Sequence, residues 1–107
     1  MSVAQRRKRV GLNLPVEVRG RDEAGTRFTE LTRSVNVSGG GILFESHRQV
    51  AVGDRLTLAI EVPLSLRRHV GDRDVYRAQA VVCRVEPGAT HGPRRVGARV
   101  LGPPEPK

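Results

Sequence analysis

Two short segments of this chain carry side chains suited to binding an anionic ligand. The first is the basic cluster Arg6, Arg7, Lys8 and Arg9, and the second is the polar, glycine-rich run from Asn36 to Gly41. Arginine offers a planar fork of donors to phosphate, and it also hydrogen-bonds O6 and N7 of guanine. Asn and Ser add short donors and acceptors, and successive backbone amides of a glycine turn form an anion-binding nest. Together the segments suit a ligand with both phosphate charge and purine edges.

The overall charge also favours an anionic partner. The 107 residues include 19 Lys and Arg against 11 Asp and Glu, for a net charge of +8. Such an excess suits a nucleotide, a nucleic acid, an acidic protein surface or an anionic lipid. Cys83 is the only cysteine, which excludes an internal disulfide and fits a reducing compartment. No apolar run approaches about 18 residues, and no apolar segment follows the basic cluster, so we expect a soluble cytoplasmic protein.

The elements that must position these segments are short strands. Apolar residues alternate with polar ones in several places, most clearly at Leu56, Leu58, Ile60 and Val62. Because aromatic residues make up only 3% of the chain, the core must be built from Val, Leu, Ile and Ala. No helical stripe is present, and Gly and Pro punctuate the chain with turns. Strands are predicted at about residues 14–19, 27–37, 42–44, 56–62, 76–85 and 96–100.

This pattern predicts an all-β fold, a small six-stranded antiparallel barrel. Closure of the barrel would remove the exposed edges that short strands otherwise present. Residues 20–25 are expected to form a turn, and Pro15 restricts the first strand to a sheet edge or to a strand start. We predict a flexible basic arm over residues 1–11, the barrel over 12–102 and a disordered tail over 103–107.

The order of the two segments resembles the PilZ family of bacterial cyclic di-GMP receptors. That family combines an Arg-x-x-x-Arg arm, a first strand that often begins Leu-Pro-Val, and Asp/Asn-x-Ser-x-x-Gly after the second strand. This chain has Leu14-Pro15-Val16 and then Asn36-x-Ser38-x-x-Gly41, a full match to the last motif. Arg9 stands where the second arginine of the arm usually lies.

The closing residues 96–100 are also similar to the family's last strand, so the resemblance covers nearly the whole chain. It implies a PilZ-like barrel that senses cyclic di-GMP without making or degrading it. The arm would order over the ligand, and a separate, unidentified downstream protein would receive the signal. The resemblance implies ligand binding by Arg6, Arg7, Arg9, Asn36, Ser38, Gly39, Gly40 and Gly41.

In detail, the resemblance assigns the arginines to guanine edges and phosphates. Asn36 and Ser38 would bond the other guanine or the adjacent phosphate, and the glycines would keep the floor of the site open. The arm departs from the family pattern because Gln5, not arginine, lies four residues before Arg9. Either Arg6 or Arg7 takes the missing role through slack in the arm, or the arm is degenerate and affinity is weak or absent.

Two other classes of binding protein fit the charge. One is a small basic barrel that binds nucleic acid, although only Phe28, Phe44 and Tyr76 could stack on bases, and Phe44 is expected to be buried. The other is a PilZ-like module that binds a protein partner without any ligand. Salt-dependent binding to random DNA would indicate the first, and nucleotide-independent partner binding the second.

Catalytic and metal sites are not indicated. The chain has no nucleophile motif, P-loop or dinucleotide fingerprint, so we do not expect an enzyme. His47, His69 and His91 are too widely separated for the usual zinc spacing, and no metal or cofactor is predicted. Cys83 falls within an apolar strand, where a small packing residue is expected.

Overall fold

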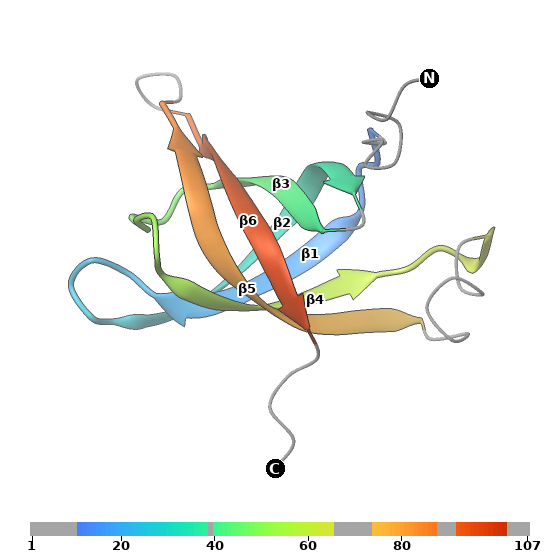
Figure 1. Cartoon of the computed structure of the whole chain (residues 1–107), viewed down its shortest axis with the longest axis horizontal. Helices are drawn as coiled ribbons and strands as arrows, with labels where there is room; N and C mark the ends of the chain where they lie inside the picture. Colours follow the sequence, from blue (N-terminus) through green and yellow to red (C-terminus); the bar gives the residue numbers. More distant parts are fainter. Residues whose placement is uncertain (1–10, 39, 66–73, 88–91, 103–107) are drawn as a thin grey trace, which may run out of the picture.

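The chain folds into a small β-barrel, described here from a computed structural model (Figure 1). The structure describes residues 11–38, 40–65, 74–87 and 92–102. The strands are β1 (Pro15–Arg21), β2 (Arg27–Ser38), β3 (Gly41–Ser46), β4 (Arg55–Glu61), β5 (Val75–Glu86) and β6 (Arg94–Gly102). Each of the predicted strands is present, and most are longer than their apolar alternation indicated.

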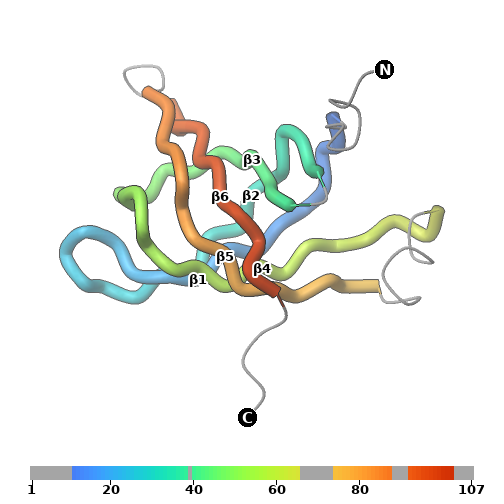
Figure 2. Tube along the Cα trace, in the orientation of Figure 1, coloured from blue at the N-terminus to red at the C-terminus, as the bar shows by residue number. Residues whose placement is uncertain are grey.

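The strands form one closed ring in the order β1-β2-β3-β6-β5-β4, and every neighbouring pair is antiparallel. The predicted six-stranded antiparallel barrel is therefore confirmed. Pro15 begins β1, where a missing backbone N–H is tolerated, and β1 has β2 on one side and β4 on the other. The tube trace shows the β1–β2 turn and the β2–β3 turn at opposite ends of the barrel (Figure 2).

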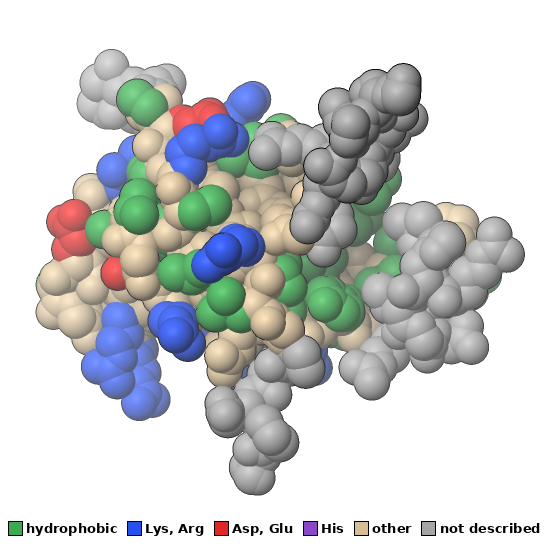
Figure 3. Space-filling view, in the orientation of Figure 1, with side chains coloured by type: hydrophobic (Ala, Val, Ile, Leu, Met, Phe, Trp, Pro, Cys, Tyr) green, Lys and Arg blue, Asp and Glu red, His purple; other side chains and the backbone are tan. Residues whose placement is uncertain are grey.

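The barrel interior is aliphatic, as the composition required. Leu58, Ala78 and Ala80 have no exposed surface, and Val18, Val82 and Val96 are nearly as deeply buried. Two aromatic rings, Phe28 and Phe44, complete the packing and are also buried. The charged side chains of the described residues lie outside this interior, and Figure 3 shows basic side chains prevailing over acidic ones on the face in view.

Two local expectations are wrong, and both involve strand geometry. Gly20 was expected in a turn, but it lies within β1, which continues to Arg21. A Cβ atom at Gly20 would lie 2.6 Å from Cδ2 of Leu56, so this glycine serves close packing inside a strand. Cys83 was expected to be a small packing residue, but it is exposed, because side chains alternate along β5 and its neighbours in the inward phase are Ala80 and Val82.

No helix within the described ranges has the length and apolar character needed to cross a membrane.

A matched pair of leucine substitutions tests the core. Leu58 is completely buried, whereas Leu64 is 77% exposed. Leu58→Ala should lower the free energy of unfolding by about 2–5 kcal/mol, because it removes buried methyl groups and leaves a cavity. Leu64→Ala should change it by less than about 0.5 kcal/mol. Urea denaturation followed by circular dichroism measures both, and equal effects would contradict the assigned interior.

Candidate functional site

A cavity of about 450 Å³ opens where the end of β2 and the start of β3 meet β5 and β6. Asn36 and Ser38 reach it from the last residues of β2, and Gly40 and Gly41 from the turn and the first residue of β3. The structure therefore brings these four predicted residues to one place. The other predicted ligand residues, Arg6, Arg7, Arg9 and Gly39, lie outside the described residues.

The cavity floor depends on a close approach between two strands. Gly41 pairs with Arg99 of β6, and a Cβ atom at Gly41 would lie 3.0 Å from the carbonyl oxygen of Ala98. The backbone N–H of Val100 donates to the carbonyl of Gly40 at 3.0 Å, which continues the contact into the turn. Gly41 does not adopt a left-handed φ, so it is needed for its lack of a side chain.

The floor also has an apolar part. Leu43 pairs with Asn36, lines the cavity and is only 6% exposed. It nevertheless does not belong to the core cluster, which takes the flanking residues Ile42 and Phe44 from the same strand. Because side chains alternate along a strand, Leu43 lies on the outer side of β3. A planar, partly apolar group could therefore rest on Leu43 while polar side chains at the rim bond its edges.

Seven of the residues that line the cavity were not predicted as site residues, and three of these carry a thiol or a charged side chain: Cys83, Arg84 and Arg99. Arg99 is exposed beside Gly41, and Arg84 pairs with Gly97, with its side chain close to that glycine. An Nη of Arg84 lies 3.1 Å from a carboxylate oxygen of Glu86, and both side chains are partly exposed. Nothing in the sequence connects these arginines with Asn36, because only the register of β6 between β3 and β5 brings them together.

The chain just before β1 is fixed to β2 through a buried serine. Ser34 has no exposed surface; its hydroxyl donates to the carbonyl of Leu12 and accepts from the N–H of Leu14 at 2.9 Å. The N–H of Ser34 also donates to the carbonyl of Leu14 at 2.9 Å. Arg33 adds hydrogen bonds to the side chain and the carbonyl of Asn13. Residues 12–14 are therefore held against the strand that carries Asn36 and Ser38.

The aromatic side chains do not form a platform for nucleic-acid bases. Phe28 and Phe44 are buried, and Tyr76 packs partly against the core. The guanidinium of Arg48 lies 5.2 Å from the centre of the Phe28 ring, so it covers that ring.

No group of three His, Cys, Asp or Glu side chains within the described ranges could hold a metal ion. His47 is exposed, and His69 and His91 lie outside those ranges.

The structure thus combines a closed six-stranded antiparallel barrel with an Asn-x-Ser-x-x-Gly segment at the rim of an outer cavity. The PilZ domain model matches residues 4–107, so the chain belongs to the PilZ domain family. No curated protein matches the sequence.

Two solved structures support the fold. The Bacillus subtilis inhibitor of motility, MotI/DgrA, superposes with a TM-score of 0.64 at 21% identity, over 94% of this chain and 43% of that one. This chain therefore spans less than half the length of that protein. The PilZ domain of Escherichia coli YcgR, in a structure with c-di-GMP, superposes with a TM-score of 0.61 at 15% identity. That match covers 91% of this chain and 77% of the other.

The close approach at Gly41 gives a stability prediction. Gly41→Ala should reduce the free energy of unfolding by about 1–3 kcal/mol, because the new methyl group presses on the backbone of β6. Gly11→Ala is the control, since a Cβ atom at Gly11 would meet nothing within 4 Å. Thermal and urea denaturation of both variants measure the difference. A Gly41→Ala protein as stable as the control would show that β3 and β6 are less closely packed here.

Proposed function

We propose that this protein is a cytoplasmic cyclic di-GMP receptor that binds the nucleotide without turning it over. The observation that carries the proposal is the Asn36-x-Ser38-x-x-Gly41 run, which lines one outer cavity with two arginines from other strands. Family membership adds support, as does the fold shared with the YcgR domain, whose structure includes c-di-GMP. The charge of +8 favours a ligand with two phosphates.

In this proposal each part of the cavity has a distinct role. Asn36 and Ser38 hydrogen-bond a guanine edge or the neighbouring phosphate, as short polar side chains at the rim. Arg99 and Arg84 supply positive charge from β6 and β5, and Arg84 exchanges its partly exposed ion pair with Glu86 for a phosphate oxygen. Gly40 and Gly41 keep the floor low enough for a purine to approach the backbone.

The basic arm completes the clamp. Because β1 and β2 are antiparallel, moving back along the chain from Pro15 to Leu12 means moving along β2 toward Asn36. From Leu12, the three residues back to Arg9 span at most about 10 Å. Arg9 therefore has the reach to meet a ligand beside Asn36, and Arg6 or Arg7 follows within another short stretch. Arg6 or Arg7 takes the role of the first family arginine, which Gln5 does not fill.

Ordering of the arm provides the signal in this proposal. A ligand held by both the cavity and the arginines fixes residues 1–11 against the outer face of β2 and β3. This changes the surface that a downstream protein meets, so the nucleotide concentration is converted into a change of partner binding.

Calorimetric titration with cyclic di-GMP tests the receptor proposal. The full chain should bind in the micromolar range or tighter, whereas GMP, which offers one guanine and one phosphate, should bind much more weakly. Arg9→Ala should lose about 2–3 kcal/mol, or roughly 30- to 150-fold in affinity, through a lost charged, two-pronged contact. Asn36→Ala should lose less because its contacts are neutral.

Arg95→Ala is the matched control for charge, because Arg95 is exposed on β6 and does not line the cavity. The affinity of Arg95→Ala for cyclic di-GMP should stay within about twofold of that of the unaltered protein, since salt screens an exposed charge outside the cavity. No heat and no competition at about 100 μM ligand would reject the receptor proposal and favour a ligand-independent interaction module. Unchanged binding by Arg9→Ala alone would remove Arg9 from the site.

Limited trypsin digestion tests the arm. Saturating cyclic di-GMP should slow cleavage after Arg6, Arg7 and Arg9 by about tenfold or more, because a held arm must open before the protease can act. Mass spectrometry of the released peptides identifies the sites, and cleavage after Arg95 serves as the internal reference. Equal slowing at every site would indicate general stabilisation by the ligand, and no slowing at the arm would contradict its role in binding.

A further inference from the structure

A row of arginines crosses three neighbouring strands at the other end of β2. Arg21 of β1 is directly opposite Arg27 of β2 in the strand register. On the other side of β1, Arg19 is opposite Thr57 of β4, and the same register continued by two residues sets Arg21 opposite Arg55. Consistent with this, a Cβ atom on Gly20 would lie 3.5 Å from the carbonyl oxygen of Arg55. We name Arg27, Arg21 and Arg55 the arginine row.

The arginine row has no neutralising partner among the described residues. The ion pairs found there are Arg19 with Glu17 and Arg84 with Glu86, and neither includes a member of the row. Like charges directly opposite each other destabilise an antiparallel pair. The fold therefore carries a local repulsion at this position that an external anion would relieve.

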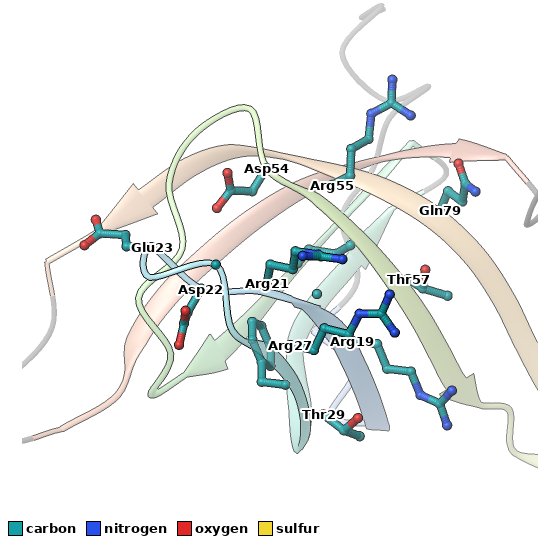
Figure 4. Close-up of a pocket in the computed structure, with 14 residues that line it drawn as sticks. Arg19, Arg21, Asp22, Glu23, Arg27, Thr29, Asp54, Arg55, Thr57 and Gln79 are labelled. Carbon is teal, nitrogen blue, oxygen red and sulfur yellow. The ribbon is translucent and has the colours of Figure 1, made fainter.

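The nearest carboxylates serve the turns instead. Oδ1 of Asp22 accepts hydrogen bonds from the N–H groups of Ala24 and Thr26, each at 3.0 Å. Oδ2 of Asp54 accepts from the N–H of Ala51 at 2.9 Å. Figure 4 shows the Asp22 and Asp54 side chains at the loops, and the guanidinium groups of Arg21 and Arg27 extending away from them. Neither Asp22 nor Asp54 forms an ion pair with the arginine row.

The arginine row borders a cavity of about 900 Å³, whose lining also includes the buried residues Phe28 and Leu56. Its lining shares no residue with the cavity at Asn36. The two cavities draw on opposite ends of β2, and the turns beside them lie at opposite ends of the barrel (Figures 1 and 2). A ligand at one cavity therefore leaves the other free.

We propose that the arginine row is a docking surface for an acidic segment of a partner protein. Arginine forks bind carboxylates with two parallel hydrogen bonds, and neighbouring strand backbones lie about 5 Å apart, so one acidic segment that crosses these strands can reach more than one of the arginines. The surface stands without the nucleotide site, and only its use in relaying cyclic di-GMP rests on the proposed function.

The surroundings favour a protein over a nucleic acid. Asp22, Glu23 and Asp54 line one end of the cavity and would repel a phosphate backbone that continued across it. Phe28 is buried beneath Arg48 and cannot stack on a base. A protein segment can place acidic residues on the arginine row and a basic residue at the acidic end, which a uniform polyanion cannot do.

Fluorescence anisotropy tests the docking surface with a labelled synthetic peptide that repeats the unit Glu-Leu-Ser. At low salt the full chain should bind this peptide and not the version with Gln in place of Glu. The double variant Arg21→Gln/Arg27→Gln should weaken binding at least about tenfold. The control Arg77→Gln/Arg95→Gln removes the same charge from exposed positions outside both cavities and should weaken it less than about twofold.

Several outcomes would overturn the docking surface. These are no peptide binding, equal weakening by the two double variants, and preferential binding of oligo-dT or of phosphatidylserine vesicles that depends on Arg21 and Arg27. Circular dichroism should show that Arg21→Gln/Arg27→Gln is folded and at least as stable as the unaltered protein, because a repulsion is removed. Its cyclic di-GMP affinity should be unchanged, so failure of the docking surface and failure of the receptor proposal are separately visible.

Discussion

The whole structure depends on the double pairing of β1, which bonds β2 on one side and β4 on the other. With this strand in place the sheet closes, and every strand has two partners. Closure gives a chain with few aromatic residues an interior narrow enough for Val, Leu, Ala and two Phe rings to fill. Among the residues that the structure describes, no charged side chain is buried, so the charged groups are available on the outer face and at the two ends of the barrel.

The same arrangement explains why two unlike surfaces share one small protein. β2 is long, and it leads from the arginine row at Arg27 to the polar rim at Asn36 and Ser38. Its middle is fixed through Ser34, which also holds residues 12–14. The proposed nucleotide site and the proposed docking surface thus lie at opposite ends of one strand. This separation is what an adaptor needs if it is to hold a small ligand and a protein at the same time.

Much of this structure could be predicted from local patterns. Alternation at Leu56, Leu58 and Ile60 identifies β4, and six such segments without a helical stripe indicate an antiparallel barrel. The Asn-x-Ser-x-x-Gly motif also indicates residues that share a cavity in the structure. These features depend on neighbours in the sequence, which is why the sequence alone can reveal them.

The features that could not be predicted depend on register. Arg99 comes next to Gly41, and Arg21 next to Arg27, only because of how separate strands align. A shift of one residue would have moved these side chains to the other face. Cys83 was misplaced for a different reason: it lies in the outward phase of β5 beside the buried Val82, which the apolar composition of the segment does not distinguish. Gly20 looked like a turn residue because nothing local reveals the side chain of Leu56 above it.

The register irregularity between Ser34 and Asn36 has a broader consequence for this strand. Phe28 and Ser34 are buried at even positions, yet beyond the irregularity Val37, at an odd position, packs against the core. The extra residue thus reverses which positions of β2 face inward: even-numbered residues do so before the irregularity and odd-numbered residues after it. Without it, Asn36 and Ser38 would occupy the frame of Ser34 and point into the barrel. The polarity of the outer cavity is therefore encoded by the length of the strand as much as by the identity of its residues.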